Sequence, residues 1–472
     1  MPTGLHEALR TLAEELRDAA QANTQDLLRC DRGGAEGLMR IALVLQNGRP
    51  TEGTEDLRIF LSECLKRGHK EMAATEGLHS WGWRRMYTDA CMLLAYADVL
   101  DFSATGDNAL ALSAVSHLDN SIVIAGAPGE GRLNAILDII DGIQAECLGF
   151  SSGQRKDVSF VTAAHPSSES NFVAAPLLSA EKPVLRLDTP PSLGTFVSRL
   201  SRQPFVLPGF LLDWPALNEH PWRSLDYLRA VAGPGRVVPV EVGSDYRSDD
   251  WTQKMMPWDE FLANLEEDEG DRPAGTPPRP VLYLAQHSLF SQFPALTEDI
   301  LVPDYVYCDL GPPEDYPRYV PPANDERLVL NAWLGPAGTV SPAHTDPFFN
   351  FYGQVVGRKT IWLAPPGVSP YMYSYPIGAD IAGEVSNSSQ QPRNPAANNE
   401  SPSLSNTSRV DVLVSSPEDH SRSKSEYPVF WEKAVPDALS VTLKPGDLLF
   451  FPPGWWHAMR SEERSFSVSM WF

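Results

Sequence analysis

One stretch of the chain combines groups that bind metals with the pattern of a buried strand. In "SPAHTDPFFNF" (341–351), His344 and Asp346 stand two positions apart among aromatic residues. Side chains at i and i+2 of a strand point to the same face, so this pair would share one face and Thr345 would lie on the other. A buried imidazole or carboxylate is costly unless it is paired or holds a metal. The spacing therefore predicts two adjacent ligands of one metal ion.

A third ligand is expected from a neighbouring strand. Of ten histidines, His457 is the best candidate because it follows a Pro-Gly turn and an apolar run in "LKPGDLLFFPPGWW". Two histidines and one carboxylate, with other positions left open, are the ligand set of non-haem Fe(II) oxygenases. Zinc in a hydrolytic site can use similar ligands, so the residues alone allow both metals.

A lysine inside the apolar run "VVGRKTIWL" indicates an anion nearby. Lys359 would be buried in a strand, where an ammonium group needs a negative partner. The distal carboxylate of 2-oxoglutarate would suit this cation, and Tyr283, Ser341 and Asn350 could add hydrogen bonds to the same molecule. An ion pair between Lys359 and an internal Asp or Glu is the alternative.

The segments that must position these residues predict an α+β protein with two domains. Residues 1–150 have helical periodicity, as in "LHEALRTLAEELRDAA", and predict a helical domain. Residues 151–182 are weakly patterned and favour a linker. From 183 to 472, short runs such as "PVLRLD", "RVVPVEVG" and "PVLYLAQH" alternate with Pro and Gly turns. That alternation is typical of an all-β sandwich or a jelly roll.

One segment of the second half has a different composition. Residues 378–426 are rich in Ser, Asn and Pro and nearly lack aromatic residues. Such a composition buries too little apolar surface to offset the entropy of ordering, so we expect most of this insert to be disordered. We also expect that residues 380–424 can be deleted with little loss of stability, because long surface insertions cost little loop entropy.

Charge and cysteine content narrow the classes of partner. The net charge of −23 argues against direct nucleic-acid binding, which needs a basic surface. It is compatible with a basic protein or peptide partner, although solubility alone also explains it. The five cysteines are scattered without a C-x-x-C pair, which gives no support to structural zinc or to disulfides. No apolar run of about 18 residues and no signal-peptide pattern occur, so we expect no membrane span and a nuclear or cytoplasmic location.

The second half of the chain resembles the jumonji C family, whose domain is a double-stranded β-helix of the cupin type. The resemblance covers residues 183–472 and rests on "PFVLPGFLLDWPAL", "VPVEVGSDY", "YLAQHSLF", "NAWLGPAGTVSPAHTDPFFNF", "VVGRKTIWL" and "SFSVSMWF". A helical N-terminal region fits one group within that family. The chain departs from the family pattern in the insert and in Thr345, and neither departure removes a ligand.

The resemblance implies a role for three sets of residues. It assigns Fe(II) to His344, Asp346 and His457, 2-oxoglutarate to Tyr283, Ser341, Asn350 and Lys359, and the substrate pocket to Glu241, Tyr246, Trp333 and Trp471. Within that pocket, a carboxylate such as Glu241 matches the two parallel donors of a guanidinium group. Aromatic walls would stack on the same planar cation.

We therefore expect an Fe(II)- and 2-oxoglutarate-dependent dioxygenase, with O₂ as the second cosubstrate, that hydroxylates a protein or peptide side chain. Arginine is the first candidate, and N-methyl hydroxylation of a methyl-lysine histone tail, which demethylates it, is the alternative. A non-enzymatic scaffold whose helical domain docks a protein partner is a further alternative. A zinc isomerase or hydrolase would leave Lys359, Tyr283 and Asn350 without an explanation.

Overall fold

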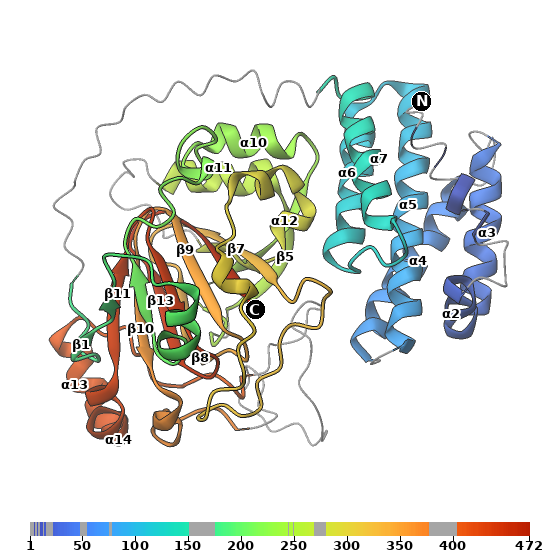
Figure 1. Ribbon diagram of the computed structural model, residues 1–472. Coiled ribbons are helices and arrows are strands. Elements are labelled where there is room, and N and C mark those ends of the chain that lie inside the picture. The colour runs from blue at the N-terminus through green and yellow to red at the C-terminus, as the bar shows by residue number, and fades with distance from the viewer. Residues whose placement is uncertain are drawn as a thin grey trace.

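The fold consists of a helical array followed by two β-sheets, which confirms the expected α+β class (Figure 1). This computed structural model describes scattered positions between 4 and 15, and residues 22–47, 54–74, 78–150, 175–268 apart from 244 and 249, 280–376 and 404–472. No helix in these parts is long and apolar enough to cross a membrane. The helices of the array end at Glu146 and the first strand begins at Lys182. The domain limits at 150 and 183 stay predictions, because most of the expected linker lies outside the described residues.

The helical array is organised around its longest helix. Its members are α2 (Ala22–Cys30), α3 (Arg32–Gln46), α4 (Thr54–Ala74), α5 (Leu78–Thr105), α6 (Asn108–Val123) and α7 (Arg132–Glu146). Helix α5 contacts α2, α3, α4 and α6, so its apolar residues are buried on almost every side. Leu93 and Tyr96 on α5 and Ile140 on α7 belong to the core of the array. A helix that buries apolar residues on most of its faces is expected at such a central position.

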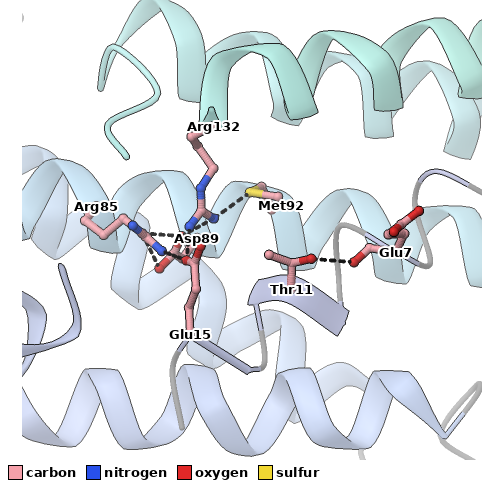
Figure 2. A network of polar contacts seen from close by, with 7 residues as sticks. All are labelled: Glu7, Thr11, Glu15, Arg85, Asp89, Met92 and Arg132. Carbon is pink, nitrogen blue, oxygen red and sulfur yellow. Dashed lines mark hydrogen bonds and ion pairs between the residues drawn. The ribbon is translucent and has the colours of Figure 1, made fainter. Parts of the chain in front are cut away.

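A charged network ties the beginning of the chain to this array (Figure 2). Glu15 accepts hydrogen bonds from both Arg85 on α5 and Arg132 on α7. Asp89 is fully buried and also pairs with both arginines, at 2.9 Å from Arg85 Nε and 3.0 Å from Arg132 Nη1. Buried charges persist in a fold when they are paired in this way, so the network fixes α7 against α5.

The remainder of the chain builds two sheets with the strand order of a cupin jelly roll. One has the order β1-β11-β10-β13-β8 and the other β2-β3-β12-β9-β14-β7-β6-β4-β5. The strands are β1 (Lys182–Pro183), β2 (Leu185–Arg186), β3 (Phe205–Leu207), β4 (Val237–Val242), β5 (Thr252–Pro257), β6 (Leu282–His287), β7 (Val329–Gly335), β8 (Val340–Thr345), β9 (Asn350–Val356), β10 (Lys359–Ala364), β11 (Leu439–Leu443), β12 (Leu448–Phe451), β13 (Trp456–Ser461) and β14 (Ser465–Trp471).

The two sheets enclose an apolar core that supports the site. Tyr352 and Leu449 from the larger sheet pack in one cluster with Ile361 and Leu363 from the smaller sheet. The short helices are α9 (Leu193–Thr195), α10 (Leu225–Ala232), α11 (Trp258–Asp268), α12 (Leu289–Gln292), α13 (Pro417–Glu426) and α14 (Pro428–Lys433). Of these, α10, α11 and α12 bury apolar side chains in a second core with residues of the larger sheet. The strands are thus held from both faces, which gives the side chains between the sheets a rigid frame.

A buried ion pair joins the helical array to the larger sheet. Arg236, just before β4, pairs with Asp119 on α6 at 2.9 Å (Nε to Oδ2) and 2.8 Å (Nη2 to Oδ1). Both side chains are at most 4% exposed. Gln144 on α7 adds a hydrogen bond to the carbonyl of Ala232 at 3.0 Å. The array is therefore attached next to the strand that carries Glu241.

The expected disorder of the insert is wrong for its second part. Residues 404–426 are described and packed, whereas 378–403 lie outside the described residues. Val410, Val412 and Leu413 are buried in one cluster with Trp362 and Phe430. The apolar run "VDVLV" (410–414) supplies this burial. Its signal was lost because the composition was averaged over a mostly polar segment, and deletion of 380–424 would remove packed residues.

A single substitution tests this correction. Leu413→Ala is expected to lower the free energy of unfolding by about 2–5 kcal/mol, because a buried leucine loses both transfer energy and packing. Leu301 is 54% exposed, so Leu301→Ala is a matched control with an expected change within about 0.5 kcal/mol. Urea denaturation followed by fluorescence measures both values. Equal effects of the two variants would show that the 404–426 segment does not stabilise the fold.

Candidate active site

The three predicted metal ligands meet at the end of the smaller sheet. His344 lies on β8, Asp346 follows that strand by one residue, and His457 lies on β13. Strands β8 and β13 pair antiparallel with His344 directly opposite His457, and the two imidazole rings are 4.2 Å apart. One potential ligand atom from each of the three residues lies within 4.8 Å of the others. The spacing of His344 and Asp346 predicts two of the three ligands. The register of β13 against β8 brings the third ligand, His457, next to them.

Hydrogen bonds orient both histidines toward a common point. Nδ1 of His344 is 2.7 Å from the carbonyl of Pro342, and Nδ1 of His457 is 3.1 Å from the carbonyl of Trp455. A carbonyl oxygen accepts a hydrogen bond, so each Nδ1 donates and Nε2 is the ring nitrogen left to bind a metal. Nε2 of His457 is 3.4 Å from Asp346 Oδ2, and Nε2 of His344 is 4.0 Å from Oδ1. Two imidazole nitrogens and a carboxylate oxygen thus converge as an Fe(II) site requires.

Burial keeps the first histidine in its metal-binding form. Desolvation, followed by the neighbouring His457, lowers the pKa of His344 to about 4. The imidazole is therefore neutral at neutral pH and can donate its lone pair to a cation. The donor set fits Fe(II). It consists of the three residues that the sequence predicted as metal ligands and that the structure brings together.

The predicted cosubstrate lysine lies between the sheets without a carboxylate partner. Lys359 is 1% exposed, and burial lowers its pKa to about 7. Its Nζ donates to the hydroxyls of Tyr352 at 2.9 Å and Tyr283 at 3.3 Å. Within the described parts of the chain no carboxylate pairs with it, so the alternative of an internal ion pair finds no support there. Tyr283 also forms a hydrogen bond with Ser341, which brings three of the four predicted cosubstrate residues together.

The fourth predicted cosubstrate residue has an unused polar atom. Asn350 on β9 is 2% exposed, and its Oδ1 has no hydrogen-bond partner among the described residues. It lies directly opposite Trp471 on β14, whose Nε1 is likewise buried without a partner. Buried polar groups are almost always satisfied, so two unpartnered atoms in one cross-strand pair fit a polar molecule bound there. The residues present thus fit 2-oxoglutarate, and Lys359 is the cation that would receive one of its carboxylates.

The predicted substrate carboxylate accepts one side-chain hydrogen bond among the described residues. Glu241 on β4 lies opposite Tyr283 of β6 and accepts a hydrogen bond from Trp251 Nε1 at 3.2 Å. Desolvation raises the pKa of Glu241 to about 7, the Trp251 hydrogen bond opposes that rise, and Asp245 adds to it. Nearby Arg247 pairs with Asp245 at 3.1 Å rather than with Glu241. Among the described residues, Glu241 is therefore a partly buried carboxylate without a cationic partner.

Of the other predicted substrate residues, Trp333 lies beside Tyr283 and Tyr246 contacts the insert. The Trp333 ring is 6.1 Å from that of Tyr283, and its Nε1 donates to Ser469 at 3.0 Å. Tyr246 follows β4, and its hydroxyl is 3.4 Å from Thr407 Oγ1. The structure thus places Glu241 and Trp333 beside Tyr283, which in turn contacts Lys359. Their roles toward substrate stay predictions.

Sequence reasoning missed several side chains of this region. Tyr352 holds Lys359 and stands two residues after Asn350, so strand alternation could have found it. Asn331 stands two residues before Trp333, is 5% exposed and has an unpartnered Nδ2. Trp251 and Thr407 come from a loop and from the insert, where no periodic signal exists.

Comparison with known proteins agrees with this geometry. The family described as "Cupin-like domain" matches residues 197–472. "Lysine-specific demethylase 8" of Danio rerio is 35% identical over 83% of this chain and 81% of its own length. "Jumonji C domain-containing protein 5" of Drosophila melanogaster is 39% identical over 60% of this chain and 58% of its own length. "Lysine-specific demethylase JMJ30" of Arabidopsis thaliana is 35% identical over 57% of this chain and 49% of its own length.

Fold, ligand set and relatives define a class of protein. The double sheet with its His-Asp-His cluster is that of a cupin-type oxygenase. The chain belongs to the jumonji C family of cupin-like proteins. It is an Fe(II)- and 2-oxoglutarate-dependent dioxygenase, as the resemblance implies, and the non-enzymatic and zinc alternatives give way to this class.

Proposed function

We propose that this dioxygenase hydroxylates an arginine side chain of a protein or peptide substrate. The observation that carries the proposal is Glu241, a desolvated carboxylate that no cation of the described residues neutralises. A guanidinium presents a fixed fork of donors that a carboxylate accepts in two parallel hydrogen bonds. Trp333 and Tyr246 would supply aromatic surface for the same planar cation.

The residues between the sheets would hold the metal and cosubstrate. His344, Asp346 and His457 would bind Fe(II) on one side and leave the remaining positions open. Lys359, with Tyr283, Ser341 and Asn350, would hold 2-oxoglutarate through its carboxylates. Once bound, iron, 2-oxoglutarate and O₂ supply the oxidising chemistry, with succinate and CO₂ as by-products. The apolar core around Tyr352 and Ile361 would keep water out of this space.

Glu241 would orient the substrate for that chemistry. Pairing with Glu241 would hold the guanidinium end of the substrate arginine. The methylene carbons of that arginine would then be fixed in position for hydroxylation. Hydroxylation at Cβ or Cγ, which carry no nitrogen, leaves a stable alcohol and does not cleave the side chain. Binding of the cation would also favour the ionised carboxylate, because an opposite charge lowers a carboxyl pKa.

Demethylation of a methyl-lysine histone tail is the second candidate. It is favoured by the names of the Danio rerio and Arabidopsis thaliana relatives, which are called lysine-specific demethylases. Those names also motivate a nuclear location. A methylated ammonium lacks the donor fork of guanidinium and is usually held by aromatic faces, so it makes less use of Glu241.

Mass spectrometry of peptides incubated with enzyme, Fe(II), 2-oxoglutarate and O₂ separates the two activities. Our proposal expects a gain of one oxygen on arginine in an array of arginine-containing peptides. Loss of methyl groups from a methyl-lysine peptide, together with unmodified arginine throughout the array, would replace the arginine proposal with demethylation.

Lys359→Ala is expected to raise the KM for 2-oxoglutarate about 30-fold or more. A buried carboxylate that loses its cation costs about 2–5 kcal/mol, and each 1.4 kcal/mol is about tenfold in affinity. Succinate production against 2-oxoglutarate concentration measures the change, while Fe(II) affinity is expected to stay within about twofold of wild type. Lys444→Ala is the matched control, because Lys444 is exposed on the surface. An unchanged KM would mean that Lys359 does not bind 2-oxoglutarate and only forms hydrogen bonds with the two tyrosine hydroxyls.

A further inference from the structure

Strand β8, which carries His344, lies at the edge of the smaller sheet. The last part of the insert covers that edge. Strand β8 ends the smaller sheet, and Thr407 pairs antiparallel with His344 across this edge. The backbone N–H of Thr345 donates to Asn406 at 3.1 Å, and that of Ser408 donates to Ala343 at 2.8 Å. We call residues 406–409 the clasp. Main-chain hydrogen bonds of this kind add a short strand to a sheet edge.

The clasp is held from its other side as well. The N–H of Tyr375 donates to Thr407 at 3.1 Å, and the N–H of Arg409 donates to Tyr373 at 3.2 Å. Thr407 is 1% exposed and Ser408 is fully buried. A segment bonded along both edges and buried at its centre is part of the framework of the site, and its side chains occupy defined positions.

Side chains from the predicted substrate loop end on the clasp. The hydroxyl of Tyr246 is 3.4 Å from Thr407 Oγ1, and Arg247 Nη1 donates to the carbonyl of Ser408 at 3.4 Å. Both residues follow β4, the strand of Glu241. The clasp thus connects the strand that carries His344 with the loop next to the substrate carboxylate. Burial raises the pKa of Tyr246 far above its usual value, so its phenol stays neutral and can form the Thr407 hydrogen bond.

We propose that Thr407 is a positioning residue for substrate binding, which holds the Tyr246 ring at the substrate opening. The proposal rests on the function proposed above, because it assigns Tyr246 to the peptide-binding side of the site. Thr407 acts through Tyr246. Its hydroxyl also donates to Asn406 Oδ1 at 3.4 Å, and among the described residues these are the two hydrogen bonds of its side chain. It makes the insert a determinant of substrate affinity.

A double-mutant cycle tests whether Thr407 acts through Tyr246. Thr407→Val keeps the branched shape and removes the hydroxyl, with its hydrogen bonds to Tyr246 and Asn406. It is expected to raise the KM for the arginine peptide about three- to tenfold, the usual value of one hydrogen bond. Tyr246→Phe removes the same bond from its other end. The double variant is expected to be no worse than Tyr246→Phe alone, because each change removes one shared interaction.

Thr442→Val is the matched control for the loss of a hydroxyl. Thr442 on β11 shares a 3.0 Å hydrogen bond with Thr360, away from the clasp, and its variant is expected to keep the wild-type KM for peptide. KM for 2-oxoglutarate and thermal melting are measured for every variant. If Thr407 were only structural, Thr407→Val would lower the melting temperature and alter both KM values. Additive effects of Thr407→Val and Tyr246→Phe on the peptide KM would also overturn the proposal.

The experiments distinguish failure of the arginine hydroxylation proposal from failure of the Thr407 proposal. If the wild-type protein demethylates a methyl-lysine histone-tail peptide and leaves arginine unmodified, the proposed function fails. The same cycle is then measured with the methyl-lysine peptide, and coupling between Thr407 and Tyr246 supports the clasp by itself. A wild-type protein that modifies neither peptide overturns both.

Discussion

His344→Ala and Asp346→Ala are each expected to abolish 2-oxoglutarate turnover while the protein still melts cooperatively. Each change removes one of three converging ligand atoms, and the two that remain cannot hold Fe(II) in the geometry that oxygen chemistry requires. The fold survives because the strands around the site are held by the apolar core between the sheets. Succinate production with added Fe(II) and a thermal melt of the same sample measure the two properties.

A matched control separates this effect from a general loss of histidine. His69 lies on α4 in the helical array, and His69→Ala is expected to keep wild-type turnover. Replacement of Fe(II) by Zn(II) is expected to remove turnover from the wild type, since zinc does not undergo redox chemistry. Turnover retained by either ligand variant would show that the metal is held elsewhere.

Glu241→Gln is expected to lower kcat/KM for an arginine peptide about 30-fold or more. The substitution keeps the shape of the side chain but leaves the guanidinium without its counter-charge in a desolvated site, at a cost of about 2–5 kcal/mol. Glu298→Gln is the control, because Glu298 is exposed. Turnover is read as oxygen gain on arginine by mass spectrometry. A variant that processes the arginine peptide at the wild-type rate would remove Glu241 from the substrate site.

The pH profile provides a second measurement of the same carboxylate. Burial raises the pKa of Glu241 to about 7, and only the ionised form pairs with guanidinium. The peptide KM is therefore expected to fall as the pH rises toward 7 and to level off above it, with about a tenfold change per pH unit on the acidic side. Saturating 2-oxoglutarate removes the contribution of Lys359. Glu241→Gln has no such group, so the acidic limb of its profile is expected to be flat.

The active site shows how far local patterns reach. Alternation along a strand predicted that His344 and Asp346 share a face, and both ligand atoms do converge. The apolar run around Lys359 predicted a buried cation, and it is 1% exposed. These inferences worked because strand periodicity and the cost of burying charge act over a few residues and leave a direct trace in the sequence.

The insert shows where such reasoning stops. Composition averaged over 378–426 predicted disorder, yet Val410 and Val412 pack beneath the smaller sheet. Thr407 pairs with His344 across a long separation in the chain. A short apolar run gains its stability from the surface that it meets, and that surface is built by distant strands.

The sequence by itself determined the chemical types at the site: two imidazoles, a carboxylate, a buried ammonium and a run of short strands to carry them. Only the tertiary structure decided which groups meet. The register of β13 against β8 sets His457 opposite His344, and the packing of the sheets places the Tyr352 hydroxyl on Lys359. Register is fixed by hydrogen bonds and core contacts between segments far apart in the chain, so no local pattern encodes it.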